Sequence, residues 1–294
     1  MKLLVLGTGA GESYPGLWCT CENCSYARTY GGKNIRSNSA VMINDDLLID
    51  MPASALQNAA RWGVSLAQVK TLLVTHPHTD HFSANHLWNR NWPKAFDQHG
   101  REEIVGKQSA PCASPLPMME IYGTRFVRYA IENAEDLTLS TEEYHYRFHE
   151  IAGGVRFETN GYQVTALDAR HGEPGFTVNY ILEKDGVSLL YATDTGGYSA
   201  EVWREIAAHR YHCVFLEATA GAIPLTGIAG HMNLERAEAF LGQLKAQGCL
   251  MENSQLYLTH LSPHWTPPHD KLAPMLEQKG IGVAYDGQSI KITD

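Results

Sequence analysis

Four side chains able to bind a metal ion occur within six residues of this sequence, at positions 76–81, which read HPHTDH. His76, His78 and His81 offer imidazole nitrogens and Asp80 offers carboxylate oxygens. These are ligands that suit zinc and related divalent ions. Four ligands on one short segment are more than a single metal centre easily uses. The run therefore predicts two adjacent metal ions that share one turn.

Three further candidates lie just beyond apolar runs elsewhere in the chain. His171 follows residues 164–169, Asp194 follows residues 189–193, and His260 follows residues 256–259. In layered α/β folds, the strand ends at one edge of a sheet gather into a single site. Seven ligands from four strand ends would fill the coordination spheres of two metal ions and leave room for a bridging water.

A second group of candidate ligands is the cysteine cluster, which consists of Cys19, Cys21 and Cys24. In a reducing compartment, clustered cysteines are more often metal ligands than disulfide partners. The other cysteines are dispersed, and Cys213 lies in an apolar run that predicts a core position.

The elements that must position these residues are short apolar runs alternating with helical patterns, which is typical of a mixed α/β chain. Asn233 is expected to cap the helix that begins at Leu234. The expected strands are Leu3–Leu6, Ala40–Ile43, Leu47–Ile49, Thr71–Thr75, Tyr162–Leu167, Thr177–Leu182, Val187–Ala192, Cys213–Leu216, Gln255–Thr259, Ile281–Tyr285 and Ser289–Ile292. The expected helices are Ala53–Trp62, Ala84–Asn89, Arg125–Ala134, Ala200–His209, Leu234–Gln247 and His269–Gln278.

Residues 92–119 differ from the rest of the chain, because four prolines and two glycines interrupt them. We expect an irregular insertion here, since long loops in compact domains are usually functional or lie on the surface. The insertion is expected to be a surface loop or, alternatively, to form a wall of the substrate pocket or an oligomer contact.

Composition narrows the classes of partner. The formal net charge is −9 and no run of lysines and arginines is visible. Proteins that hold nucleic acid through its phosphates need a basic face, so a small substrate is expected rather than nucleic acid. No stretch of 18 apolar residues predicts a membrane span. The apolar run at residues 1–6 is too short for the core of a signal peptide, and a cytoplasmic location is expected.

The run at 76–81 resembles the HxHxDH signature of the metallo-β-lactamase superfamily. The resemblance extends along the chain, from the opening Leu6–Gly9 through His171 and Asp194 to Leu258–His260. It implies a four-layered αβ/βα sandwich, built as a single domain over residues 1–294, with a dinuclear site at one edge. By this resemblance His76, His78 and His171 hold one metal, Asp80, His81 and His260 hold the other, and Asp194 bridges them.

The CxCxxC run after a GTG start resembles a narrower group within the superfamily. This group includes the phosphoribosyl cyclic phosphodiesterases of phosphonate breakdown and the B proteins of pyrroloquinoline quinone biosynthesis. The resemblance implies a structural zinc held by Cys19, Cys21, Cys24 and His264, a closed ligand set that suits such a site. It also implies a homodimer.

The expected reaction is hydrolysis of a small cyclic or diester phosphate by a hydroxide that bridges two metals, which can be zinc, manganese or iron. Asp80 and His231 are the expected catalytic residues. His231 resembles the family's active-site histidine that is not a ligand, and it would give a proton to the leaving group or hold the phosphate. Thr195 is expected to touch substrate.

Fold membership alone does not choose a reaction. A hydrolase acting on a thioester or lactone therefore stays open, and so does a cofactor-biosynthesis protein without phosphodiesterase activity. A ribonuclease is less favoured because the sequence shows no basic run.

Overall fold

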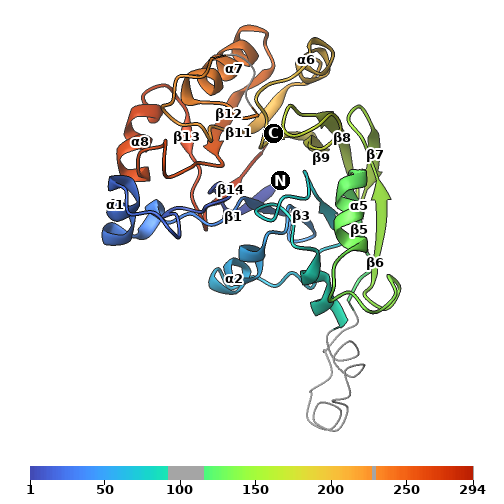
Figure 1. Cartoon of the computed structure of the whole chain (residues 1–294). Helices are drawn as coiled ribbons and strands as arrows, with labels where there is room; N and C mark the ends of the chain where they lie inside the picture. The colour runs from blue at the N-terminus through green and yellow to red at the C-terminus, as the bar shows by residue number, and fades with distance from the viewer. Residues whose placement is uncertain (92–115, 227–229, 294) are drawn as a thin grey trace.

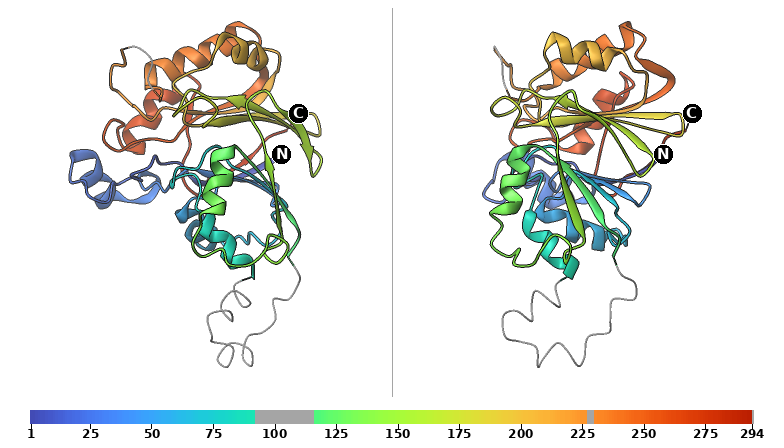
Figure 2. Two further views of the ribbon diagram at one scale, coloured as in Figure 1. Left: turned by 45° about the vertical axis from the view of Figure 1, so that its right-hand side comes forward. Right: turned by 90° about the vertical axis from the view of Figure 1, so that its right-hand side faces the viewer.

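Two β-sheets packed face to face form the centre of the molecule, and helices cover their outer faces (Figures 1 and 2). The structure is a computed structural model that describes residues 1–91, 116–226 and 230–293. The two ends of the described chain lie side by side, because β1 pairs with β14 and the amino group of Met1 donates a hydrogen bond to the carbonyl of Ile292 at 2.8 Å. This is the predicted four-layered metallo-β-lactamase sandwich in one domain.

The first sheet contains seven strands among the described residues, in the order β14-β1-β2-β3-β4-β5-β6. Strands β3, β4, β5 and β6 run parallel to one another. The neighbouring pairs β14–β1, β1–β2 and β2–β3 are antiparallel. The strands are β1 (Lys2–Gly7), β2 (Ala40–Ile43), β3 (Leu47–Ile49), β4 (Thr71–Leu73), β5 (Met119–Gly123), β6 (Tyr146–Glu150) and β14 (Ser289–Lys291).

The second sheet also has seven strands in the described part of the chain, in the order β13-β12-β11-β10-β9-β8-β7. Strands β10 to β13 are parallel, and β7 to β10 pair antiparallel. The strands are β7 (Arg156–Thr159), β8 (Tyr162–Asp168), β9 (Val178–Lys184), β10 (Val187–Ala192), β11 (Tyr211–Glu217), β12 (Leu250–Thr259) and β13 (Gly282–Val283).

Three apolar clusters hold these layers together, because each sheet buries side chains on both faces. The first lies between the sheets and joins residues such as Val5 and Val41 to Tyr180 and Phe215. The second packs the second sheet against α6, α7 and α8, and the third packs the first sheet against α2 and α5. The helices are α1 (Glu22–Tyr30), α2 (Ala53–Arg61), α5 (Arg125–Glu132), α6 (Ala200–Ala207), α7 (Leu234–Ala246) and α8 (His269–Glu277), with 3₁₀ turns η1 (Gly32–Asn34) and η2 (Ala84–Asn91).

Most of the expected elements are present, and Asn233 caps α7 by accepting a hydrogen bond from the backbone N–H of Arg236. The helix expected at Ala84–Asn89 is instead the 3₁₀ segment η2. Strands β6 and β7 were not expected, because each lies at a sheet edge and carries polar residues that break the apolar pattern. Helix α1 was not expected either, and it follows directly on the cysteine cluster.

Most of the expected insertion, residues 92–115, lies outside the described residues. Residues 116–118 are irregular, as expected, but strand β5 (Met119–Gly123), which begins at the last residue of the expected insertion and pairs with β4 and β6, was not predicted. Within the described ranges, no helix combines the length and apolar character that crossing a bilayer would require.

Candidate metal centre

The strand directions bring the predicted ligands to one edge of the two sheets. Strands β10, β11 and β12 are parallel, so Asp194 and His260 leave their strands at the same end. Strand β8 runs in the same direction because it pairs antiparallel with β9, which pairs antiparallel with β10, and His171 follows it. His76 follows β4 in the facing sheet. Asp194 and His260 adopt left-handed backbone, with φ of 51° and 55°, a conformation that costs free energy and concentrates at functional sites.

His76, His78 and His171 form the first group of candidate ligands. Nδ1 of His78 lies 2.9 Å from Nε2 of His76 and 3.2 Å from Nε2 of His171. One nitrogen from each ring therefore points at a common centre. His76 is fully buried, whereas His78 is exposed, so the group opens to solvent on one side.

Asp80, His81 and His260 form the second group. Nε2 of His81 lies 3.0 Å from Nε2 of His260, and Oδ2 of Asp80 lies 3.4 Å and 3.6 Å from these two nitrogens. Both imidazoles are buried. The two groups correspond to the two ligand sets that the resemblance implied.

Asp194 lies between the two groups. Its Oδ2 is 2.8 Å from Nε2 of His81 and 3.1 Å from Nε2 of His260, while its Oδ1 is 3.8 Å from Nε2 of His171. One carboxylate thus reaches both groups, as a bridging ligand must.

Two observations show that this constellation fits metal ions. Oδ2 of Asp194 is buried and faces the Nε2 atoms of His81 and His260, so that carboxylate oxygen and imidazole nitrogens, the donors that divalent ions prefer, converge at one point. Burial and the neighbouring His81 hold the pKa of His76 well below its usual range, which favours the neutral imidazole, the form that can ligate a metal ion. Burial alone would raise the pKa of Asp194, but His260 and His81 hold it well below its usual value.

The opposite ring nitrogens of the candidate ligands contact residues that the sequence analysis did not identify. Nδ1 of His81 lies 2.7 Å from Oδ2 of Asp50, Nδ1 of His260 lies 2.8 Å from Oγ1 of Thr219, and Nδ1 of His171 lies 3.2 Å from the carbonyl of Gly230. Ligating histidines usually use their second nitrogen in this way, which fixes the ring and its tautomer. Asp50 directly follows strand β3, so the rule that found Asp194 and His260 would also have found it.

His231 lies beside the candidate ligands and outside both groups. Its ring centroid is 4.7 Å from that of His171 and 5.9 Å from that of His260. Its Nδ1 lies 3.2 and 3.3 Å from the two carboxylate oxygens of Glu217, and 3.6 Å from Oδ1 of Asp194. Burial would lower the pKa of His231, but the hydrogen bond and charge of Glu217 raise it to about 9.

Glu217 was also missed by the sequence analysis, although it ends strand β11. It is fully buried and accepts hydrogen bonds from the backbone N–H groups of Thr195, Thr219 and Met232. One carboxylate therefore organises the loops that follow Asp194 and precede α7. Such a buried, multiply bonded acid carries no sequence motif beyond its place at a strand end.

Thr195 is not placed as expected. It is fully buried, and its hydroxyl donates a hydrogen bond to the carbonyl of Gly197 at 2.7 Å. Its backbone N–H is held by Glu217. The prediction that Thr195 touches substrate is not favoured by this geometry, because the hydroxyl is used within its own loop.

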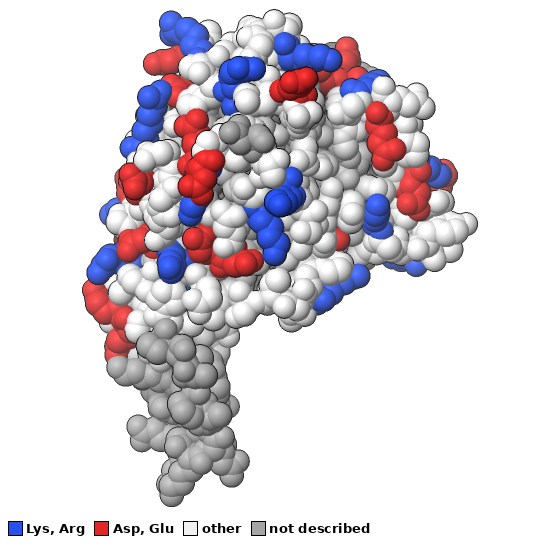
Figure 3. Space-filling model, turned by 180° about the vertical axis from the view of Figure 1, so that it is seen from behind, with Lys and Arg blue, Asp and Glu red and all other residues white. Residues whose placement is uncertain are grey.

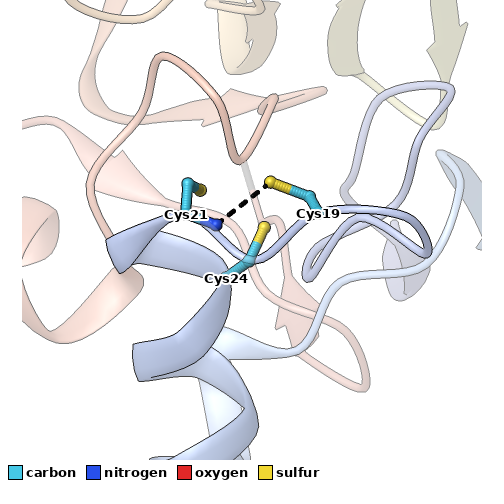
Figure 4. A group of neighbouring side chains, drawn as sticks. All are labelled: Cys19, Cys21 and Cys24. Atoms are coloured by element: carbon cyan, nitrogen blue, oxygen red, sulfur yellow. Dashed lines mark hydrogen bonds between the residues drawn. The ribbon is translucent and has the colours of Figure 1, made fainter.

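The cysteine cluster gathers at the start of α1 (Figure 4). The sulfurs of Cys19, Cys21 and Cys24 lie within 4.8 Å of one another. The backbone N–H of Cys21 donates to Sγ of Cys19 at 3.4 Å, and the N–H of Gly16 donates to Sγ of Cys24 at 3.3 Å. The first of these bonds lowers the pKa of Cys19, whereas burial raises the pKa of Cys24 to about 12. Three converging thiols at one point are a group that could hold an ion.

His264 reaches this cluster from the other end of the chain. Its Nδ1 lies 3.6 Å from Sγ of Cys19, and its Nε2 lies 3.7 Å from Oε1 of Glu12. The side chain of Asn23 donates to the carbonyls of Pro263 and Thr266 and so joins α1 to the segment that carries His264. All four residues predicted for the structural zinc are therefore neighbours.

Comparisons with known proteins agree with this architecture. A family profile described as "Beta-lactamase superfamily domain" matches residues 46–261. Ribonuclease Z of Listeria innocua is 27% identical over 196 residues, which are 65% of this chain and 52% of that protein. Ribonuclease Z of Mycobacterium bovis is 26% identical over 161 residues, 50% of this chain and 52% of that protein. The chain thus aligns with about half the length of these curated relatives.

Two solved structures share the fold over nearly all of their length. A diphosphatase from the PhnP family superposes with a TM-score of 0.72 at 20% identity, covering 99% of this chain and 98% of that one. Zinc-bound PqqB from Methylobacterium extorquens superposes with a TM-score of 0.72 at 17% identity, covering 99% and 100%. At these identities the likeness concerns the fold. The chain therefore belongs to the beta-lactamase superfamily and has the metallo-β-lactamase fold of that superfamily's metal-dependent hydrolases.

Proposed function

We propose that this protein is a dinuclear metal-dependent phosphodiesterase that acts on a small diester or cyclic phosphate. The observation that carries the proposal is the position of Asp194 between two separate groups of ligands. His76, His78 and His171 would hold one ion, and Asp80, His81 and His260 the other. When bound, two divalent ions acidify water and stabilise the charge that develops on phosphoryl oxygens.

The chain's own contribution to the reaction centres on His231 and Glu217. Glu217 accepts from Nδ1 of His231 and favours its protonated form, so Nε2 can carry a proton at neutral pH. That proton would pass to the ester oxygen that leaves phosphorus. A positioned general acid of this kind contributes about 10²–10⁴-fold to a rate.

Asp50, Thr219 and Gly230 would act as positioning residues. They fix the rings of His81, His260 and His171 through the nitrogens that do not face the centre. Thr195 would hold the loop of Asp194 rather than contact substrate. Cys19, Cys21, Cys24 and His264 would hold a structural zinc that joins the segment before α1 to the segment after His260.

The charge of the molecule supports a small substrate. The net charge is −9, and acidic and basic side chains are interspersed over the face seen in Figure 3 rather than separated by sign. A protein that tracks a nucleic-acid backbone uses a continuous basic surface. Zinc, manganese and iron all suit the ligand set. A homodimer stays a prediction from the resemblance.

Ribonuclease activity is the second candidate, because the curated relatives are named ribonuclease Z. The two candidates differ in the substrate that is cut efficiently. Cleavage of a single-stranded RNA oligonucleotide at a kcat/KM well above that for small diesters would favour the ribonuclease. The reverse ratio would favour the small-molecule enzyme.

The direct test is hydrolysis of bis(p-nitrophenyl) phosphate by protein loaded with Zn²⁺ or Mn²⁺. Turnover should depend on the metal, disappear in Asp80→Ala and fall only modestly in His231→Ala, because p-nitrophenolate leaves with little help from an acid. Asp185→Ala is the matched control, since Asp185 is exposed on the turn between β9 and β10. No turnover by protein shown to carry two ions in the site would contradict the proposal and favour a thioester or lactone substrate, or a role in cofactor biosynthesis.

A further inference from the structure

Two side chains, Phe126 and Phe176, form an apolar wall beside the candidate metal centre, hereafter the phenylalanine wall. The ring centroid of Phe176 is 5.0 Å from that of His78 and 5.7 Å from that of His76, two members of the first group of candidate ligands. The ring centroid of Phe126, in α5, is 5.1 Å from that of Phe176. The wall therefore begins in contact with candidate ligands and continues onto the neighbouring helix.

The fold brings the two rings together from different sheets. Strands β4 and β5 are parallel, so α5, which follows β5, begins at the sheet edge where His76 follows β4. Phe176 comes from the facing sheet, on the segment between His171 and β9. The hydroxyl of Thr124, the N-cap residue of α5, donates a hydrogen bond to the carbonyl of Phe176 at 3.3 Å and so joins the two segments.

The segment that carries Phe176 is closed on itself by hydrogen bonds. The hydroxyl of Thr177 donates to the carbonyl of His171 at 3.0 Å, and the N–H of Phe176 donates to the carbonyl of Glu173 at 3.0 Å. Gly172 has a φ of 76°, and a β-carbon there would lie 2.6 Å from Cδ1 of Phe176, so only glycine leaves room for the ring. The ring thus has a fixed position beside His171, as a group that orients a substrate requires.

The phenylalanine wall keeps apolar surface in contact with water. Phe126 and Phe176 are both only partly buried, and His78 beside them is exposed. Aromatic surface left in water forgoes the free energy that its burial would give. Ligand sites combine such apolar walls with a few polar groups. A ligand bound at the open side of the first group of candidate ligands would cover this surface.

His231 and the phenylalanine wall lie against different candidate ligands. The ring centroid of His231 is 4.7 Å from that of His171, whereas that of Phe176 is 5.0 Å from that of His78. A diester held between the two groups of ligands would therefore direct one ester arm toward His231 and the other toward the wall. Because His231 is the proposed proton donor to the leaving oxygen, the arm at the wall is the one that stays on phosphorus.

We propose that the phenylalanine wall binds the ester arm that stays on phosphorus, and that this arm carries an apolar ring. Phe126 and Phe176 are then specificity-determining residues. Their rings are tilted by 57° to each other, so a flat ring can meet one by its face and the other by its edge. This inference rests on the proposed phosphodiesterase function, because that function defines the two arms.

The test is isothermal titration calorimetry of the zinc-loaded protein with phenyl phosphate and methyl phosphate, the monoesters that remain when the other arm has left. Both bring the same phosphate to the metal centre, and only phenyl phosphate carries a ring. Phenyl phosphate should bind more tightly than methyl phosphate by about tenfold or more. Phe126→Ala should weaken the binding of phenyl phosphate by about three- to tenfold, while changing the Kd of methyl phosphate by less than about twofold.

The choice of variants separates ring recognition from support of the metal centre. Among the described ring contacts, Phe126 touches Phe176 and none of the candidate ligands, so Phe126→Ala should keep the full content of bound ions. Phe176→Leu keeps an apolar side chain but removes the flat ring, and should weaken phenyl phosphate selectively. Tyr30→Ala is the matched control, because Tyr30 is an exposed ring that also pairs with another, Tyr26, in α1 on the opposite side of the molecule from α5 (Figure 1).

The proposal is overturned if methyl phosphate binds as tightly as phenyl phosphate, if Phe126→Ala and Phe176→Leu leave the Kd of phenyl phosphate unchanged, or if both monoesters weaken in the same proportion. Turnover of bis(p-nitrophenyl) phosphate is measured on the same preparations. Turnover without a preference for the ring would overturn the assignment of the wall alone. A ring preference that depends on Phe126, without turnover, would overturn the phosphodiesterase and the ester-arm assignment, while retaining a site for aryl phosphates.

Discussion

Oδ2 of Asp50 lies 2.7 Å from Nδ1 of His81, and both side chains are fully buried. Asp50 also accepts from the backbone N–H of Thr75 at 2.8 Å and from its hydroxyl. One carboxylate thus joins the end of β3 to the turn that begins the HPHTDH run. It directs Nε2 of His81 toward Asp80, Asp194 and His260.

Replacing Asp50 by asparagine should weaken metal binding, because the His81 ring would lose the charged partner that fixes its tautomer. We expect a loss of about 10–100-fold in affinity for the more weakly held ion, measured by competition with a chelator. Asp185→Asn is the control, since Asp185 is exposed at a turn with the same left-handed backbone. Unchanged affinity in Asp50→Asn would show that His81 needs no such partner.

The pairing of His231 with Glu217 predicts a dependence on the leaving group. A poor alkoxide leaving group needs a proton, whereas p-nitrophenolate departs with little help. Glu217→Gln and His231→Gln should therefore slow hydrolysis of an alkyl phosphodiester by about 10²-fold or more, and slow p-nitrophenyl esters much less. His209→Gln, which changes a partly buried histidine that also faces a glutamate, Glu205, is the control. Equal losses on both substrates would assign His231 to phosphate binding instead.

Substituting Cys24 by serine should remove one bound zinc ion per chain and lower the melting temperature by several degrees, because the thiol cluster would lose its buried member. Elemental analysis and thermal unfolding measure the two effects. Cys249→Ser is the matched control, because Cys249 is also buried but lies outside the cysteine cluster. This variant should keep the full zinc content. Equal zinc content in both variants would rule the cluster out as a metal site.

His269 provides a pH dependence that is independent of the metal centre. Burial lowers the pKa of His269 to about 4, and the guanidinium of Arg36, 3.1 Å from its Nδ1, acts in the same direction. The unfolded chain, with a histidine pKa near 6.5, binds this proton more readily than the folded protein. The stability contributed by neutral His269 is thus fully present above about pH 6.5 and is lost as the pH falls toward 4.

We expect His269→Gln to lose less free energy of unfolding than the wild type between pH 7 and pH 5, measured by urea denaturation at each pH. His149→Gln, which changes a partly exposed histidine at the β6 edge, controls for general histidine effects. The same pH dependence in wild type and His269→Gln would contradict this assignment.

Replacement by alanine should have opposite effects on stability at two glycines, Gly7 and Gly242. A β-carbon on Gly7, at the end of β1, would lie 1.8 Å from the carbonyl oxygen of Asn38, so Gly7→Ala should destabilise the protein by about 1–3 kcal/mol or more. Gly242, within α7, has open space around the same position. Gly242→Ala should stabilise the helix by up to about 1 kcal/mol. Chemical denaturation of both variants checks the two signs.

The sequence alone predicted a mixed α/β chain, because apolar runs of strand length are local patterns. The four-layered sandwich was predicted from the resemblance of the HPHTDH run to the metallo-β-lactamase signature. The sequence also identified the ligand types, since only a few side chains bind divalent ions. Strands β6 and β7 were not predicted from the sequence, because strands at sheet edges tolerate polar residues and so lack the apolar pattern.

What the tertiary structure decided is which residues meet. Asp50 and Glu217 resemble any other acid in the sequence, and only the convergence of strands β3 and β11 on one edge places them against His81 and His231. The hydroxyl of Thr195 turned inward for the same reason, because Glu217 holds its loop. Cys19 and His264, which are 245 positions apart in the sequence, are likewise brought together only by the fold. The kinds of metal-binding side chain could therefore be predicted from residue types and spacing. The residues that contact these side chains were determined by packing between distant segments, which no local pattern encodes.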